Sequence, residues 1–300
     1  MIKKILLTLV AIVLVGAMLL YFVGIRPTYA PEGCTYELDI AKLRALAASV
    51  PGNKPTEIRV EDVTGVEFPR AIVCPGESWD KAQFRAYAYQ LVFDDKTIIV
   101  DTAMNAAQAK TLGMTEGFDE AAWERVAKGL AQASAIYVTH EHADHMGGAF
   151  ADDKWAGSLR LNPQQLDSTI MNRPEISAAA RAAAKRIGAD HYQAVAPGVV
   201  VIEAAGHTPG SQMIYVARAD GTEVIFTGDT AWLADNIDHQ QGPAKVVLAA
   251  MGSNRPALSC QLAALDHLQK TEPKVAIMPG HDKARMSELV ARGVFKPTFK

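Results

Sequence analysis

A cluster of metal-binding residue types follows an apolar segment near the middle of the chain. Residues 135–138, Ala-Ile-Tyr-Val, are predicted to form a buried strand that leads into Thr-His-Glu-His-Ala-Asp-His at 139–145. Residues two apart in an extended chain project to the same side, so His140 and His142 can bind one ion. Asp144 and His145 come after the chain turns and can face a second ion. Glu141 lies between two ligand positions and should point away from them.

Three further fragments supply candidate ligands, each at the end of a predicted strand. Site residues often occur at such places, because a rigid element there meets a loop. Imidazole and carboxylate groups suit zinc, with iron and manganese as alternatives. The candidates are His207 after Val199–Glu203, Asp229 after Glu223–Thr227, and His281 after Lys274–Met278.

These motifs, taken in order, resemble the metal-binding signature of the metallo-β-lactamase-fold superfamily, over roughly residues 57–290. The resemblance implies an α/β fold, a four-layer αββα sandwich, with a dinuclear metal site along one edge of its sheets. It also implies a supporting role for Asp101, in Val-Asp-Thr-Ala at 100–103, where the family often has Gly at the position of Ala103. The implied ligands are His140, His142 and His207 for the first ion, Asp144, His145 and His281 for the second, and Asp229 bridging both.

Such a site is typical of hydrolysis. Two divalent ions, zinc being the preferred choice, can share a water and lower its pKa from 15.7 toward about 7. The metal-bridging hydroxide can then attack a carbonyl or phosphoryl centre. We predict that Asp144 is catalytic, because it would position both the second metal and the nucleophile.

The resemblance favours a small ester, lactone or related acyl substrate. True β-lactamases generally lack the bridging aspartate that stands here as Asp229, and no basic region for glutathione is recognised. The alternatives left open are a mononuclear-iron dioxygenase of the same fold, β-lactamase or phosphodiesterase activity, and a non-catalytic metal-binding ectodomain. Trp232, Met251, Trp79 and the turn Asn254-Arg255-Pro256 are candidates for lining a substrate cleft, whereas His191, His239 and His267 lie outside any ligand pattern.

The charge balance argues against nucleic acid as a partner. The 300 residues include 30 Lys and Arg and 33 Asp and Glu, a formal net charge of −3. Binding by broad neutralisation of phosphates needs a basic excess, which this chain lacks. We therefore expect a small-molecule substrate.

The amino terminus is predicted to anchor the protein in a membrane. Lys3 and Lys4 precede an uncharged run at 5–25, which as a helix spans about 30 Å, the thickness of a bilayer core. The run is longer than the apolar part of a typical signal peptide. The two lysines favour a cytoplasmic position for residues 1–4, with a single-pass helix in the inner membrane and the catalytic domain on the periplasmic, extracytoplasmic side.

The remaining chain is predicted to comprise a tether with a short helix at 26–56 and a catalytic domain at 57–300. Its expected elements include strands at Ala71–Val73 and Lys245–Leu248, and a helix at Glu175–Ile187. In an oxidising compartment Cys34 and Cys74 could pair, which would leave Cys260 alone; the alternative is that all three cysteines are ordinary small side chains.

Overall fold

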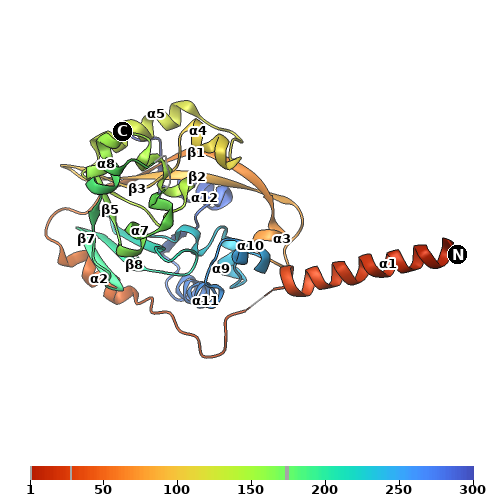
Figure 1. Ribbon diagram of the computed structural model, residues 1–300. Coiled ribbons are helices and arrows are strands. Elements are labelled where there is room, and N and C mark those ends of the chain that lie inside the picture. Colours follow the sequence, from red (N-terminus) through yellow and green to blue (C-terminus); the bar gives the residue numbers. More distant parts are fainter. Residues whose placement is uncertain (1, 28, 173–175) are drawn as a thin grey trace.

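Two β-sheets form the centre of the molecule (Figure 1). The computed structural model describes residues 2–27, 29–172 and 176–300. In this part of the chain, the larger sheet has seven strands in the order β12-β1-β2-β3-β4-β5-β6 and the smaller has five in the order β11-β10-β9-β8-β7. The strands are β1 Glu57–Pro69, β2 Lys81–Val92, β3 Thr97–Thr102, β4 Ala135–Tyr137, β5 Leu159–Leu161, β6 Lys185–Arg186, β7 Tyr192–Ala196, β8 Val199–Glu203, β9 Gln212–Ala217, β10 Glu223–Phe226, β11 Val275–Met278 and β12 Lys296–Pro297.

Helices cover the outer face of each sheet and connect the strands. The α-helices are α1 Ile2–Leu19, α2 Ile40–Ser49, α3 Arg70–Val73, α4 Ala106–Leu112, α5 Glu120–Gln132, α6 Ala143–Met146, α7 Pro163–Leu166, α8 Ala178–Ala183, α9 Ala234–Asp238, α10 Lys245–Ala250, α11 Arg255–Thr271 and α12 Lys283–Ala291. A π-helix, η1 Leu20–Ile25, continues α1. The 3-10 turns are η2 Gly147–Phe150, η3 Asp153–Ser158, η4 Thr169–Asn172 and η5 Gly228–Thr230.

Alternating side chains in β3 show how the layers form. Successive residues of a strand point to opposite faces. Ile98 and Val100 are buried between the two sheets, whereas Ile99 packs on the outer side in the same cluster as Trp123 and Leu130 of α5. Burial of these side chains therefore fixes both the strand register and the helix that covers it.

The smaller sheet repeats the pattern in β10. Val224 and Phe226 face the larger sheet, and Ile225 belongs to the outer cluster that includes Leu262 and Leu265 of α11. Helices thus lie outside both sheets. The predicted four-layer αββα sandwich is confirmed.

Three predicted elements are wrong in type or extent. Residues 71–73 form the short helix α3, and the predicted strand at 245–248 is the helix α10. The predicted helix at 175–187 is only α8, followed by β6; its first residue lies outside the described residues. β-branched residues favoured a strand in α10, but its Val246 packs beside Gly24 of η1 and not in a sheet.

The amino-terminal helix projects from the α/β body (Figure 1). The helical segment Lys3–Ile25 is long and apolar enough to cross a membrane, by length and composition, and none of its most apolar window is buried in the protein. The tether that follows is bound to the smaller sheet: Tyr192 donates its hydroxyl to the carbonyl of Glu37 at 2.8 Å. Leu43 of α2 is fully buried in the outer core of that sheet.

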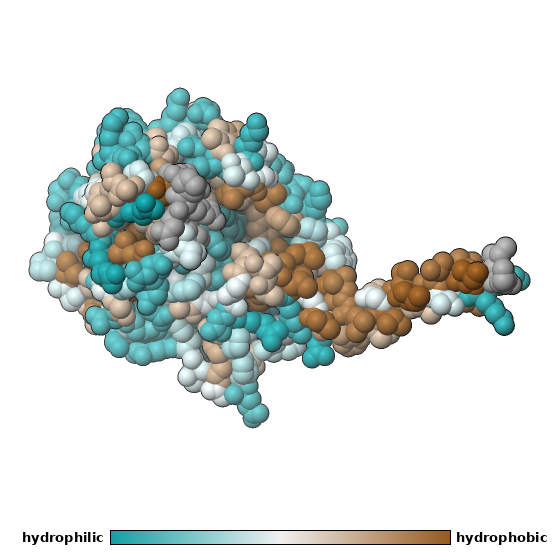
Figure 2. Space-filling view, in the orientation of Figure 1, coloured by the Kyte–Doolittle hydropathy of each residue, from teal (hydrophilic) through white to brown (hydrophobic). Residues whose placement is uncertain are grey.

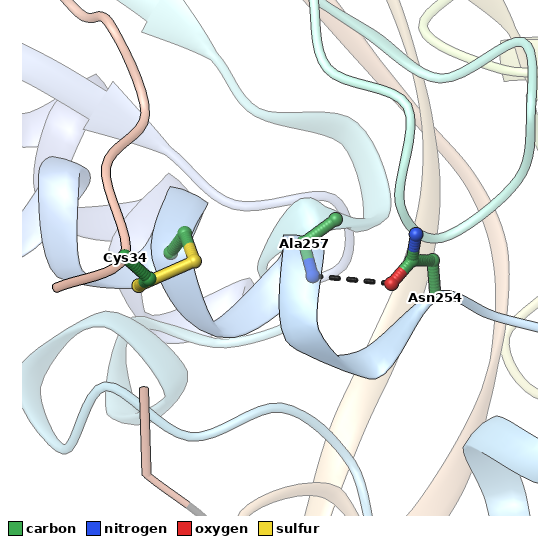
Figure 3. The surroundings of a disulfide bond; sticks show 4 residues. Cys34, Asn254 and Ala257 are labelled. Carbon is green, nitrogen blue, oxygen red and sulfur yellow. Dashed lines mark hydrogen bonds between the residues drawn. A yellow bond between two sulfur atoms is a disulfide. The ribbon is translucent and has the colours of Figure 1, made fainter. Parts of the chain in front are cut away.

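Cys34 does not pair with Cys74, the pairing that the sequence left open. Cys34 of the tether forms a disulfide with Cys260 of α11, with a Cα–Cα distance of 5.7 Å (Figure 3). Cys74 is buried and unpaired, and its burial raises the pKa of the thiol to about 12. The tether runs past the first turns of α11, where Asn254 caps the helix by accepting a hydrogen bond from the Ala257 amide. This path, which spacing in the sequence does not reveal, brings the two cysteines together.

Candidate metal centre

The candidate ligands gather where strands of both sheets end. β3 and β4 are parallel, as are β10 and β11, so the residues that follow each pair emerge at a common edge. Asp101 at the end of β3 therefore lies beside the histidine motif after β4. His207, Asp229 and His281 come from the smaller sheet, after β8, β10 and β11.

Close backbone approach at two glycines lets the loops converge. Gly228 has φ of +50°, and a Cβ there would lie 2.5 Å from Cβ of Thr139. A Cβ on Gly280 would lie 2.5 Å from Oδ1 of Asp229. Only glycine fits such contacts without movement of the neighbouring chain.

Four donor atoms form the first group. Nδ1 of His142 lies 3.0 Å from Nε2 of both His140 and His207. Oδ2 of Asp229 lies 3.2 Å from Nε2 of His207 and 3.8 Å from Nε2 of His140. A tetrahedral zinc ion with ligands at about 2.1 Å separates its ligand atoms by about 3.4 Å. The spacing of this group fits such an ion.

The second group uses the other oxygen of the same carboxylate. Oδ1 of Asp229 lies 3.0 Å from Nε2 of His281 and 3.2 Å from Nε2 of His145. Oδ2 of Asp144 completes the group at 3.6 Å and 3.8 Å from the same two nitrogens. The seven predicted ligands therefore lie together, and each oxygen of Asp229 faces one group.

The hydrogen bonds behind the ligands show which ring nitrogens carry lone pairs. Nδ1 of His281 lies 2.9 Å from the carbonyl of Arg85, which can only accept, so this nitrogen is the donor. In neutral His281, Nε2 then presents a lone pair to Oδ1 of Asp229. That oxygen is buried and has no hydrogen-bond partner among the described residues. Two facing lone pairs repel unless a cation lies between them, so the donor set fits a metal ion.

Burial and nearby carboxylates shift the pKa values of the histidines in opposite directions. Burial lowers the pKa of His207 to about 4 and lowers that of His140 well below its usual value, which keeps these imidazoles neutral and able to bind metal at pH 7. Burial also disfavours a charged His145, but Asp229, Asp101 and Asp144 outweigh it and raise that pKa well above its usual value. Carboxylates that attract a proton also attract a divalent cation.

Asp101 supports the centre from behind. One of its oxygens accepts the Thr139 amide at 2.6 Å, and the other lies 2.9 Å from Nδ1 of His145. Asp101 and Ala103 have positive φ values of 52° and 47°. Residues other than glycine adopt this conformation at a cost of order 1 kcal/mol, typically at functional sites. For Ala103 this explains why glycine is common at that position in the family that the motifs resemble.

A cleft of about 380 Å³ opens over the second group of donors. Its polar floor includes Asp144, Asp229 and His281, and its walls are largely apolar. Of the predicted cleft residues, Trp232 and Met251 belong to these walls. Trp79, which is 64% exposed, and the turn Asn254-Arg255-Pro256 do not. Other apolar wall residues were missed because they come from distant strands and helices: Val66, Phe68, Phe84, Leu112 and Met114.

The remaining predictions about polar residues agree with the structure. Glu141 points away from the donors and accepts hydrogen bonds from the Thr208 hydroxyl and the Gly210 amide. His191 lies 2.9 Å from the carbonyl of Glu37, and His239 lies 2.8 Å from the carboxylate of Glu77. Neither histidine belongs to a metal-binding group in the described part of the chain.

Parts of the chain are similar in sequence to known proteins. A family model described as the metallo-beta-lactamase superfamily matches residues 83–281. A hydroxyacylglutathione hydrolase of Albidiferax ferrireducens is 31% identical over 103 residues, which cover 34% of this chain and 36% of that protein. The match thus spans about a third of that relative.

Solved structures share the fold over most of their length. An N-acyl homoserine lactone hydrolase, with the product N-hexanoyl-L-homoserine at its catalytic metal centre, has a TM-score of 0.60 and 19% identity, over 78% of this chain and 96% of its own. A probable metal-dependent hydrolase from Staphylococcus aureus has a TM-score of 0.57 and 11% identity, over 78% and 91%. At these identities the likeness is one of fold.

Proposed function

The chain belongs to the metallo-beta-lactamase superfamily, and from this premise we propose that it works as a metal-dependent hydrolase with two divalent ions. We propose zinc as the metal and a small ester, lactone or related acyl compound as the substrate. The observation that carries the proposal is Asp229, whose two oxygens face two separate groups of donors and lie 3.0–3.8 Å from histidine nitrogens of those groups. A shared carboxylate of this kind suits two ions close enough to act on one reaction centre.

The proposed ligands divide by group. His140, His142 and His207 would hold the first ion, Asp144, His145 and His281 the second, and Asp229 both. When bound, two such ions lower the pKa of a shared water and polarise the carbonyl under attack. In hydrolysis the water oxygen bonds to the acyl carbon, the bond to the leaving oxygen breaks, and that oxygen takes a proton.

The protein's own groups orient this reaction. The side chain of Asp144 is 17% exposed, whereas that of Asp229 is 3% exposed, so Asp144 is the carboxylate more open to the cleft. We propose that Asp144 orients the attacking water and holds its proton. The apolar wall at Phe84 and Trp232 would hold the hydrocarbon part of an acyl substrate and exclude bulk water.

Elemental analysis and a substrate panel test this proposal together. Purified full-length protein in detergent, replete with metal, should contain about two zinc ions per chain. It should hydrolyse lactones or esters in preference to thioesters, β-lactams and phosphodiesters. A single iron per chain would indicate dioxygenation instead, less than one metal would indicate a binding module, and activity on phosphodiesters alone would overturn the substrate class.

We also propose that residues 3–25 anchor the catalytic unit 57–300 to the inner membrane, on the extracytoplasmic side. The Cys34–Cys260 disulfide supports this placement, because disulfides persist in oxidising compartments and are rare in the cytosol. A reporter fused after Lys300 that is active only outside the cytoplasm should be active. Activity of a reporter restricted to the cytoplasm would contradict the orientation.

A further inference from the structure

Helix α10 lies between the amino-terminal helix and the cleft. Gly24 of η1 is buried, and a Cβ built on it would lie 2.6 Å from Cγ1 of Val246, so the two residues are in direct contact. Met251, which follows α10 directly, lines the cleft together with His142 and Asp144. The start of α10 therefore contacts the membrane-length segment, and the end of α10 borders the candidate active site.

With residues 3–25 in the bilayer, as proposed above, this contact would place α10 at the level of the membrane surface. Gly24 belongs to the apolar segment Lys3–Ile25, so a side chain packed against it lies where that segment leaves the bilayer. From Val246 to Met251 a helix rises by about 8 Å. One leaflet contains about 15 Å of hydrocarbon, so an acyl chain from that leaflet is long enough to reach the cleft.

Large apolar side chains are exposed both in the cleft wall and on α10. Phe68 and Leu112, both in the cleft wall, are 43% and 42% exposed, and Val246 is 44% exposed. Figure 2 shows that the hydrophobic surface of α1 continues onto the body where the helix joins it. Exposed apolar surface of this kind is typical of sites that contact a membrane or another apolar partner.

Basic side chains surround the same junction. Arg26, Lys245 and Arg255 form a cluster in which desolvation and the charges of the two arginines lower the pKa of Lys245. A cavity of about 550 Å³ beside it is lined by Arg26, Arg255, Tyr21 and Tyr29, among others. Basic residues attract anionic headgroups, and tyrosine is enriched at the membrane interface. The cluster therefore favours a lipid surface over a second protein as the partner of this face.

We propose that the cleft takes its substrate from the bilayer, and that the substrate class is a membrane-resident acyl ester whose chain enters over α10. This rests on the proposed hydrolase activity and on the anchoring of residues 3–25. Water adds to the acyl carbonyl carbon, the ester carbon–oxygen bond breaks, and the alcohol oxygen takes a proton. The released products are a carboxylic acid and an alcohol.

The position of α10 can be tested without activity. A nitroxide attached to the thiol introduced by Val246→Cys, in full-length protein in phosphatidylcholine and phosphatidylglycerol vesicles, should be more accessible to oxygen than to a water-soluble nickel chelate. The native cysteines do not compete, because two are paired and Cys74 is buried. A label introduced by Ala48→Cys in α2, away from α1 in Figure 1, should show the reverse. Water-like accessibility at both positions would overturn the proposal.

The substrate class is tested with two esters. Full-length protein in these vesicles should hydrolyse a long-chain ester embedded in the bilayer with a kcat/KM about ten-fold above that for a soluble short-chain ester. Lys245→Glu should lower only the vesicle-borne activity, by about five-fold, because one basic residue near an anionic surface has an effect of this size. Lys274→Glu, an exposed charge reversal before β11, is the matched control and should change neither.

Failure of the hydrolase proposal and failure of the proposed entry from the bilayer would give different results. If neither ester is hydrolysed, the hydrolase proposal itself is contradicted. Equal activity on both esters, or equal loss of both in Lys245→Glu, would leave hydrolysis in place and overturn entry from the bilayer.

Discussion

A single carboxylate, that of Asp101, accepts a hydrogen bond from the ring of His145, with a distance of 2.9 Å between Oδ2 and Nδ1. The other oxygen accepts the amide of Thr139, at the end of the strand that carries the histidine motif. Asp101 thus fixes both the orientation of a proposed ligand and the chain that presents it. Such supporting carboxylates also raise the basicity of the histidine.

Replacing this carboxylate should weaken binding of the second ion more than binding of the first. Asp101→Ala frees the ring of His145, and loss of a supporting partner of this kind lowers metal affinity by about 10- to 100-fold. Chelator titration should show one ion lost at lower chelator concentration and one nearly unchanged. Asp94→Ala, on an exposed turn, is the control. Equal weakening of both ions would contradict the assignment of His145 to one group.

Asp229→Ala should have a larger effect, because it removes an oxygen from each group of donors. A direct ligand should contribute at least as much to metal affinity as a supporting residue does. We therefore expect metal affinity and kcat/KM to fall by roughly 100-fold or more. Metal content and turnover measured on the same preparation check this. Unchanged metal content and activity would contradict the bridging role.

The proposed ligands could be chosen from sequence because their positions depend on local features. Each follows an apolar run that forms a strand, and β-strands that end at one edge bring distant motifs together. The alternation of Ile98, Ile99 and Val100 likewise encodes which faces are covered. The layered fold and the position of the site can therefore be predicted from short sequence patterns.

Features that depend on packing between distant segments could not be predicted. Val246 lies in a helix and packs on Gly24, more than 200 positions earlier in the chain. Cys34 pairs with Cys260, and not with Cys74, because the tether passes α11. The cleft walls have the same origin: Phe68 and Leu112 both line the cleft although nothing near them in sequence marks a binding site.

The disulfide should stabilise the folded chain. It closes a loop between residues separated by 226 positions, and removing a disulfide typically costs about 2–4 kcal/mol of unfolding free energy. The double variant Cys34→Ser and Cys260→Ser should therefore unfold at lower urea concentration than the wild type. A reductant should destabilise the wild type to the same level and leave the double variant unchanged. A wild type insensitive to reductant would contradict a stabilising role.

Glu57 should make stability depend on pH in the acid range. Lys296, with Arg59 and Lys300, lowers the pKa of the Glu57 carboxyl to about 2 and ties β12 to β1. Because this pKa is lower in the folded than in the unfolded chain, the stabilisation is complete above about pH 4.5 and is lost as the pH falls through 2. Glu57→Gln should reduce the unfolding free energy by about 1 kcal/mol at pH 7, since the pair is partly screened by solvent.

A double-mutant cycle with Lys296→Met isolates this interaction. Urea unfolding of the four proteins should give a coupling energy that is constant from pH 7 to pH 5 and about half as large at pH 3. Tethering of β12 by the backbone alone would instead give no coupling at any pH, because the backbone pairing of positions 59 and 296 is the same in all four proteins. A coupling that grew as the pH fell would contradict the lowered pKa of Glu57, since protonation removes the charge to which Lys296 binds.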